Sequence, residues 1–302
     1  MRLLISIPEI SVERQINQMN GGTAERCWCC KAVSSYFDTA SILGRYEVRY
    51  YCCAACGFIQ TESPFWLVET YKSPMTSYDL GGVSRPTLNS ALTKAVVNWF
   101  FDAGGRFLDF GGGYGVFTRW MRDEGYDFFH YDEHCPNLFA GAHEADISGS
   151  VRYELVTAFE VFEHIPEPAK TVTHLLSISD SILFSTELLP VPTPRIADWW
   201  YYGPEHGQHV GFFTHMSLQQ LSARFGANFY TNGSSIHLIS RRQFSEKVFQ
   251  LMLHAKMRAL VNRLYRRKSL LDEDFAVAMR KSKAAAKQLM RSSTATPPAG
   301  PQ

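Results

Sequence analysis

The sequence predicts an α/β protein built on a doubly wound, mostly parallel sheet. Strand-like and helix-like patterns alternate between residues 104 and 241, which is typical of βαβ units whose helices cover both faces of a parallel sheet. Within this region, residues 107–115 read Phe-Leu-Asp-Phe-Gly-Gly-Gly-Tyr-Gly, an apolar strand that runs directly into a glycine-rich turn. A cysteine-rich segment before this core and a basic segment after it predict two smaller additions.

The glycine-rich turn indicates a nucleoside cofactor. It contains Asp109, Gly111, Gly113 and Gly115, and glycine tolerates both positive φ and close approach of a ligand. A dinucleotide fingerprint starting at Gly111 would need a small residue where Val116 stands. The pattern instead resembles the first motif of class I S-adenosylmethionine-dependent methyltransferases. The resemblance implies that the glycines pass under the methionine part of the cofactor and that Asp109 helps to hold its amino end; the alternative is an ordinary turn between strand and helix.

The next elements extend this interpretation. Residues 116–124 have apolar positions at helical spacing and predict the first crossover helix. A short aromatic strand follows at residues 127–131 and ends at Asp132, which lies 17 positions after Gly115. An acid at this place can accept hydrogen bonds from both hydroxyls of a ribose. The alternative role for Asp132 is that of a turn or cap residue, and the glycine turn favours the ribose.

A third strand is predicted at residues 153–159, before Glu-Val-Phe-Glu-His-Ile-Pro at residues 160–166. This stretch also resembles the methyltransferase family, in which the fourth strand ends in acidic and aromatic residues beside the transferable methyl group. The resemblance implies cofactor contacts by Phe159 and Glu160, and it places Asp146 near the adenine amino group.

Further elements complete a Rossmann-like core. They are a helix at 169–177, a strand at 181–185, a helix at 217–225, and a strand pair at 228–230 and 235–239 around a predicted hairpin turn. Ligands of such sheets bind at the carboxyl ends of the strands. The candidate cofactor residues named above all lie at those ends.

Six of the seven cysteines fall in two clusters with metal-ligand spacing. Two C-x-x-C pairs are present, Cys27 with Cys30 and Cys53 with Cys56. Such pairs predict a zinc ribbon, and four thiolates favour a structural zinc because they close its coordination sphere. Disulfides or buried thiols are the alternative, and Cys29 or Cys52 could replace a neighbour as ligand. The arrangement also resembles the zinc-binding segment before the catalytic domain of some bacterial sugar C-methyltransferases and related natural-product or polysaccharide enzymes.

A loop rich in aromatic residues and histidine follows the strand at 181–185. It spans residues 198–214 and should emerge at the same sheet end as the glycine turn. Histidine titrates near neutral pH, so His206 or His209 could take a proton from an acceptor hydroxyl while Glu205 or Glu163 orients the ring. His209 is the first choice as general base. The alternative is that both histidines are structural.

Two flanking segments have less specific patterns. Residues 87–101 predict a helix over the sheet edge, and the family resemblance would bring Tyr78, Asp79 and Arg85 near the cofactor, although surface positions are the simpler expectation. Residues 241–302 hold 14 Lys and Arg against 4 Asp and Glu, although the whole chain has a net charge of only +1. One apolar-faced helix is predicted at 244–260, either solvated against the acidic body or contacting an anionic partner.

Together these patterns divide the chain of 302 residues into six parts. They are an N-terminal extension (1–24), a zinc ribbon (25–62), a linker with a covering helix (63–103), the S-adenosylmethionine-binding core (104–241), a basic helical extension (242–291) and a disordered tail (292–302). No membrane span or secretory signal is expected, which favours a cytoplasmic location.

The predicted function is methyl transfer from S-adenosylmethionine to oxygen or carbon of a small molecule or sugar. A nucleic-acid methyltransferase is disfavoured because residues 159–162 lack the Asn-Pro-Pro-aromatic type of motif, and no cysteine nucleophile lies near them. A non-catalytic scaffold that docks through the ribbon and the basic helix is the other alternative. The methyl acceptor and the oligomeric state are not specified by any pattern.

Overall fold

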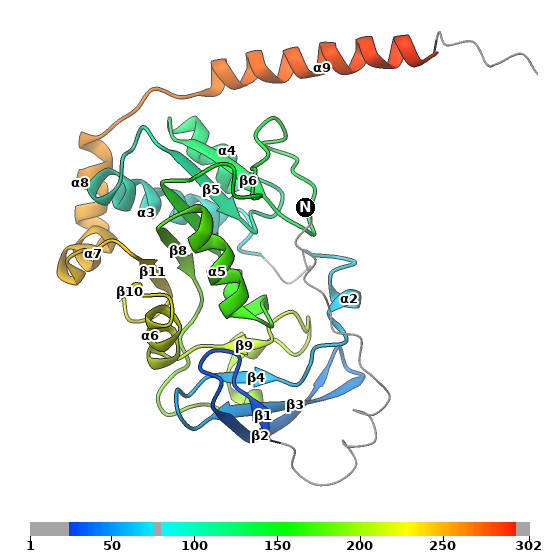
Figure 1. Ribbon diagram of the computed structural model, residues 1–302, viewed down its shortest axis with the longest axis vertical. Helices are drawn as coiled ribbons and strands as arrows, with labels where there is room; N and C mark the ends of the chain where they lie inside the picture. Colours follow the sequence, from blue (N-terminus) through cyan, green and yellow to red (C-terminus); the bar gives the residue numbers. More distant parts are fainter. Residues whose placement is uncertain (1–23, 75–79, 294–302) are drawn as a thin grey trace, which may run out of the picture.

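Residues 24–74 and 80–293 are described by the structure, a computed structural model. A six-stranded sheet forms the centre of the molecule (Figure 1). Its strands, in the order β10-β11-β8-β7-β5-β6, are Asn228–Thr231, Ile236–Ser240, Ser181–Ser185, Leu155–Phe159, Arg106–Phe110 and Asp127–Tyr131. The four strands from β8 to β6 are parallel to one another, whereas β11 pairs in antiparallel fashion with both β8 and β10. The predicted doubly wound, mostly parallel sheet is therefore confirmed.

Helices cover both faces of this sheet because its strands are apolar on both sides. Successive side chains of a strand point to opposite faces, and Leu108 packs with helices α5 (Pro168–Ile178) and α6 (His215–Ala223). Its neighbour Phe107 packs instead with α3 (Ser84–Phe100) and α4 (Val116–Asp123). The carboxyl ends of β5, β6 and β7 are thereby left open to the predicted ligand side.

A second sheet lies beyond the carboxyl end of the central sheet (Figure 1). Its antiparallel strands are β1 (Glu25–Arg26), β2 (Val33–Ile42), β3 (Tyr46–Cys53), β4 (Ile59–Thr61) and β9 (Gly211–Phe212). The short helix α2 (Leu67–Thr70) follows β4. The last strand of this sheet comes from the aromatic and histidine-rich loop, so the N-terminal segment 25–62 does not form the sheet alone. The same loop contains the short 3-10 helices η2 (Ile196–Asp198) and η3 (Trp200–Tyr202).

The prediction of one helix over residues 244–260 is wrong. The structure has two helices, α7 (Glu246–Leu253) and α8 (Ala255–Leu264), separated at His254, whose ψ of 130° is extended. Both helices pack against α3, and the break allows each to turn an apolar side toward it. Apolar periodicity does not reveal a break at one residue.

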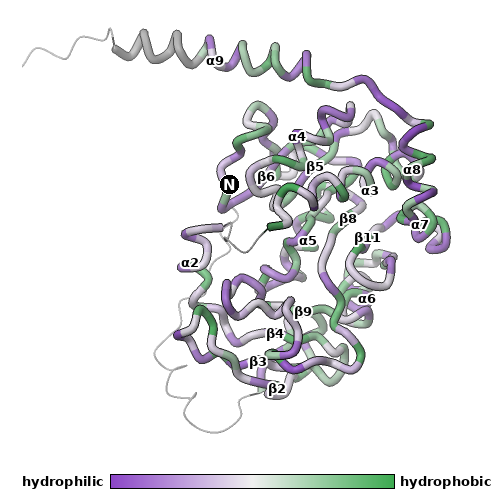
Figure 2. The backbone as a smooth tube through the Cα atoms, turned by 180° about the vertical axis from the view of Figure 1, so that it is seen from behind, coloured by the Kyte–Doolittle hydropathy of each residue, from purple (hydrophilic) through white to green (hydrophobic). Residues whose placement is uncertain are grey.

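A long helix, α9 (Leu271–Ser293), follows and extends away from both sheets (Figures 1 and 2). Residues 292 and 293 are thus helical, against the prediction of disorder from 292 onward, and residues 294–302 lie outside the described part, as does most of the predicted N-terminal extension. Among the described helices, none has both the length and the apolar character needed to cross a bilayer.

Helix α9 is attached to the core through a buried ion pair. Arg122 on α4 donates from Nε and Nη2 to the two carboxylate oxygens of Asp274, both at 2.8 Å. Arg119 reaches the same carboxylate with an N–O distance of 2.8 Å. Arg122 and Asp274 are each only 5% exposed. A bidentate pair in this environment is geometrically specific, and removing one partner leaves the other charge buried.

We therefore expect Asp274→Asn to lower the free energy of unfolding by about 3 kcal/mol, the loss typical of a broken buried pair. Urea denaturation monitored by circular dichroism measures this change. Glu273→Gln, an exposed neighbour in the same helical turn, is the matched control and should shift stability by less than about 0.5 kcal/mol. Equal effects of the two substitutions would contradict a role for the buried pair.

Candidate active site

The glycine turn after β5 has the backbone geometry that its sequence predicts. Gly111, Gly113 and Gly115 have φ values of 70°, 57° and 86°, in the left-handed region that favours glycine. A Cβ at Gly111 would lie 2.6 Å from the Val161 side chain, whereas a Cβ at Gly113 would meet nothing within 4 Å. The backbone at Gly113 therefore faces open space.

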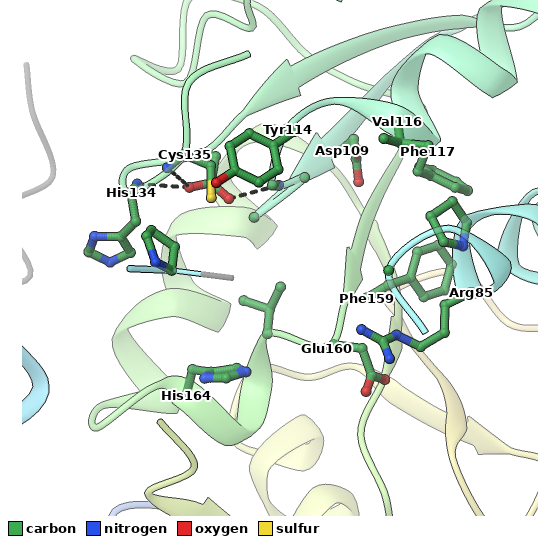
Figure 3. A pocket seen from close by; sticks show the side chains of 18 of the residues that line it. Arg85, Asp109, Tyr114, Val116, Phe117, His134, Cys135, Phe159, Glu160 and His164 are labelled. Atoms are coloured by element: carbon green, nitrogen blue, oxygen red, sulfur yellow. Dashed lines mark hydrogen bonds between the residues drawn. The ribbon is translucent and has the colours of Figure 1, made fainter. Parts of the chain in front are cut away.

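That space is a cavity of about 300 Å³ at the carboxyl ends of β5, β6 and β7. Figure 3 shows Asp109 and Tyr114 on one side of it and Glu160 and His164 on another. The predicted cofactor residues that line it are Asp109, Gly111, Gly113, Asp132, Phe159 and Glu160. The fold thus brings most of the predicted set to one cavity.

Asp109 is held as a buried acid at the floor of this cavity. Its Oδ2 accepts a hydrogen bond from the Thr118 hydroxyl at 2.8 Å, and its Oδ1 accepts one from the Thr157 hydroxyl at 3.2 Å. Burial raises the pKa of Asp109 to about 6, although His130 and the two hydroxyls favour the charged form. A cationic group placed beside Asp109 would stabilise its carboxylate.

Asp132 both caps a turn and faces the cavity. Its Oδ2 accepts a hydrogen bond from the Gly113 amide at 2.9 Å. Its Oδ1 accepts from the amides of His134 and Cys135 at 2.7 and 2.8 Å, as Figure 3 also shows. These bonds fix the carboxylate at the end of β6 and join it to the glycine turn. The turn-cap role and a ligand role are therefore compatible.

Two of the predicted cofactor residues do not line the cavity. Gly115 precedes α4 as its N-cap, and Asp146 is exposed in a separate turn where it accepts hydrogen bonds from Ser148 and Ser150. The family pattern does not account for lining residues such as Asn89 and Gln208, which come from other segments. Arg85 also lines the cavity, whereas Tyr78 and Asp79 lie outside the described residues.

A second cavity, of about 740 Å³, adjoins the first. Residues shared by both walls are Pro74, Arg85, Asn89, Glu160, His164 and Gln208. The rest of its wall includes Trp200, Tyr201, His206 and His209 from the aromatic loop. The loop predicted to lie near the glycine turn therefore forms a wall of a larger chamber beside it.

The two loop histidines have different hydrogen bonds. His209 Nδ1 lies 2.6 Å from the Tyr201 carbonyl oxygen, and since a carbonyl only accepts, Nδ1 carries the proton and Nε2 has the lone pair. His206 Nδ1 instead accepts from the Gln208 amide at 3.1 Å, so its neutral ring carries the proton on Nε2. Burial lowers the pKa of His209 well below its usual value. At neutral pH His209 is therefore an uncharged ring.

Glu163 lies behind this chamber rather than in its wall. Its side chain is fully buried in the 3-10 helix η1 (Phe162–His164), directly after β7. Burial, with a contribution from Glu160, raises the pKa of Glu163 to about 8. The Glu163 backbone oxygen accepts a hydrogen bond from the Val210 amide at 2.8 Å, which fixes the loop beside η1.

The four predicted zinc ligands are clustered. The Sγ atoms of these residues, Cys27, Cys30, Cys53 and Cys56, all lie within 4.8 Å of one another. The Sγ atoms of Cys27 and Cys56 are 3.6 Å apart, and those of Cys30 and Cys53 are 3.5 Å apart. Zn–S bonds of about 2.3 Å in a tetrahedron give S–S distances near 3.8 Å. The seven cysteines are all free thiols, and Cys29 and Cys52 lie outside the cluster.

Residues 85–231, just under half of the chain, match the family model described as "Methyltransferase domain". This segment is a methyltransferase domain. The match agrees with the predicted methyltransferase family and with the predicted class of enzyme. No curated protein matches the chain.

Solved structures similar to the methyltransferase domain include CalO1, described as a methyltransferase in calicheamicin biosynthesis (14% identity, TM-score 0.38, covering 51% of this chain and 54% of CalO1). Another is the magnesium protoporphyrin IX methyltransferase ChlM from Synechocystis PCC 6803 (13%, 0.38, 58% and 93%). A third is the plantazolicin methyltransferase BpumL (14%, 0.41, 58% and 89%).

The buried acid of the methyltransferase domain has a measurable consequence for stability. The pKa of Asp109 is raised from 3.8 to about 6, so the folded ligand-free protein binds more protons than the unfolded chain between these values. Stability should therefore fall as pH rises from about 4 to about 6, by up to about 3 kcal/mol. Urea titrations of the wild type and Asp109→Asn measure the difference. If the wild type and Asp109→Asn differed in free energy of unfolding by the same amount from pH 4 to pH 7, the raised pKa of Asp109 would be contradicted.

Proposed function

We propose that this protein transfers a methyl group from S-adenosylmethionine to a small molecule, at an oxygen or carbon atom. The observation that supports this most directly is the pair of adjoining cavities, which share Glu160 and His164 in their walls. The smaller cavity contains the glycine turn and suits the cofactor. The larger one suits an acceptor, since small-molecule sites are concave, partly apolar and furnished with a few polar groups.

The residues of the smaller cavity fit the cofactor. Gly113 offers open space where a side chain would obstruct a ligand, and Asp109 offers a buried carboxylate for the cationic amino end. Asp132 keeps acceptor capacity for a ribose hydroxyl on Oδ2, which accepts one amide bond, whereas Oδ1 already accepts two. The bound cofactor would supply an electrophilic methyl group.

Glu160 is placed to orient the reactants at the junction of the two cavities. It is a non-glycine residue with a φ of 54°, a strained conformation of the kind that clusters at functional sites. Its amide donates to Ser185 Oγ at 2.8 Å, and the Ser185 hydroxyl donates back to its carboxylate. The carboxylate therefore has a fixed position, and positioning provides much of the rate in such transfers.

His209 is the candidate proton acceptor of the larger cavity. Its Nε2 lone pair is available because Nδ1 donates to Tyr201, whereas Nε2 of a neutral His206 carries a proton. The exposed aromatic side chain of Trp200 in the same wall offers a flat surface for an acceptor ring or a sugar. A sugar or another small hydroxylated compound thus remains the proposed acceptor class.

We propose that the four clustered cysteines hold one structural zinc ion. Their sulfur distances suit tetrahedral coordination, and four thiolates leave no position for a substrate. The surrounding chain also fits a structural role, because Thr214, just after β9, donates its hydroxyl to the Cys56 carbonyl at 2.6 Å. The ion would stabilise the sheet that holds the acceptor loop.

Cofactor binding tests the first proposal. Gly113→Val should raise the dissociation constant for S-adenosylmethionine more than about tenfold, because its side chain would enter the cavity. Isothermal titration calorimetry measures the constant. Gly149→Val is the control, because Gly149 also has a positive φ, 96°, and open space where a Cβ would lie, but it does not line the cavity.

A second comparison separates ligand contact from turn capping. Asp132 and Asp146 both cap turns, but Asp132 alone of the two lines the cavity. Asp132→Ala should therefore weaken cofactor binding strongly, and Asp146→Ala should leave the dissociation constant within about twofold of the wild type. Unchanged affinity in both Gly113→Val and Asp132→Ala would exclude the proposed cofactor site.

Metal analysis tests the ribbon. Elemental analysis of purified protein should find about one zinc less per chain in Cys53→Ser than in Cys52→Ser, because Cys53 belongs to the cluster and its neighbour does not. We also expect a lower melting temperature for Cys53→Ser. Equal zinc contents in the two variants would count against this ligand set.

A further inference from the structure

We propose that Glu163, His164 and His209 form a binding site for a divalent transition-metal ion beside the larger cavity. One candidate ligand atom from each of the three residues lies within 4.8 Å of the other two. This site is separate from the cysteine cluster, and it combines two imidazole nitrogens with one carboxylate. Such a set is typical of catalytic metal centres with open coordination positions.

The backbone holds these three residues together. Glu163 and His164 are adjacent in η1, and His209 comes from the aromatic loop. The amide of Val210, the residue after His209, donates to the Glu163 carbonyl at 2.8 Å. The rings of His164 and His209 have centroids 4.8 Å apart and are nearly perpendicular, at 84°. The cluster is thus fixed from both sides and needs no rearrangement of its backbone.

Glu163 is the residue that most clearly lacks a partner. Its side chain is fully buried, and neither carboxylate oxygen has a hydrogen bond of normal geometry within the described residues. The Tyr201 and Thr186 hydroxyls are near enough to favour its charged form, and because one of them donates to the other, only one hydroxyl hydrogen is left for the two carboxylate oxygens. Buried carboxylates are normally paired or bound to metal. A cation between Glu163 and the two rings would satisfy it.

Both histidines are oriented as metal ligands usually are. His164 Nδ1 donates to the Gln208 carbonyl at 3.1 Å, and His209 Nδ1 donates to the Tyr201 carbonyl at 2.6 Å. Ligating histidines usually donate the second ring N–H to such an acceptor, which fixes the tautomer and the ring. In each ring, Nε2 is then the atom whose lone pair is left for a metal ion.

The ligand types indicate the class of metal. Two imidazoles and one carboxylate suit Fe²⁺, Zn²⁺, Co²⁺ or Ni²⁺, whereas Mg²⁺ and Ca²⁺ prefer oxygen ligands. Three protein ligands leave positions for water or substrate. Since His164 lines both cavities and His209 lines the larger one, those positions adjoin the space proposed for the acceptor.

A role in catalysis follows only if the proposed function is correct. An acceptor hydroxyl would first bind the ion through its oxygen, and its O–H bond would then break as the proton passes to water. The metal lowers the pKa of a bound hydroxyl, so the proton leaves near neutral pH. The resulting oxygen nucleophile would then bond to the methyl carbon as the carbon–sulfur bond of the sulfonium breaks and a neutral thioether leaves. In the metal-bound protein, His209 is a ligand, and it acts as a proton acceptor only without the ion.

Cobalt titration of the full-length, zinc-containing protein tests the site. We expect one Co²⁺ to bind with weak visible d–d bands and without the intense near-ultraviolet charge-transfer band that thiolate ligands give. That signature distinguishes this site from the cysteine cluster. Glu163→Gln, which preserves side-chain volume, should weaken cobalt binding at least about tenfold. Glu187→Gln is the matched control, because Glu187 lines the larger cavity and does not belong to the cluster.

Two results would overturn the metal site: no cobalt bound by the wild type, or equal cobalt affinity in the wild type and Glu163→Gln. If Glu163→Gln fails to fold, as judged by circular dichroism, His209→Asn provides the same comparison. Calorimetry with S-adenosylmethionine on the same samples keeps the two proposals separate. Loss of the cofactor proposal leaves the cobalt result intact, and loss of the metal site leaves the cofactor result intact.

Discussion

The backbone of Val210 is the link on which the arrangement of the site depends. Its N–H donates to the Glu163 carbonyl at the end of the central sheet, and its carbonyl accepts from the Thr61 amide in the smaller sheet at 3.0 Å. The next two residues pair with β4, Gly211 with Gln60 and Phe212 with Ile59. One residue therefore joins both sheets, and the adjacent His209 is held where the two cavities meet.

The cysteine-containing sheet consequently belongs to the architecture of the site. Phe58, which follows the second C-x-x-C pair, is fully buried and packs against Phe213 with ring centroids 4.8 Å apart. The same apolar cluster continues to Phe162 and Phe184 in the central sheet region. Because side chains in such a core are closely packed, a displacement of the cysteine turns would reach the acceptor loop. The smaller sheet thereby supports the wall of a chamber that lies far from its cysteines in sequence.

Local patterns predicted what is local in this fold. The strand, glycine turn and helix around Gly113 are set by neighbouring residues, and so is the spacing of the cysteine pairs; both appear as expected. The pairing of β4 with β9 was not predicted, because a contact across about 150 residues leaves no periodic signal. In the sequence, His164 stands only within the family-like stretch at residues 160–166. The role of His164 as a candidate ligand depends on its contact with His209. The one local signal for that role is that an acid and a histidine, Glu163 and His164, are adjacent shortly after a buried strand.

Periodicity also failed where one residue changes the path of the chain. At His254 an extended conformation divides a continuous apolar pattern into two helices, and tertiary packing on α3 decides the outcome. Asp146 shows a related limit. Its position in the sequence suits a cofactor contact, but the chain before it forms only a single bridge, between His130 and Glu144, and the Asp146 side chain is exposed in the following turn.

The attachment of α9 affects the order in which parts of the fold can gain their final contacts while the chain is being synthesised. Arg119 and Arg122 lie on α4, early in the core, whereas their buried partner Asp274 lies 152 residues after Arg122. On the ribosome, the segment up to the last core strand is exposed before that partner emerges. Two arginines beside the edge strand β6 then lack the carboxylate that they share in the finished protein. This edge of the sheet can reach its native electrostatic state only after the first turn of α9 has been synthesised.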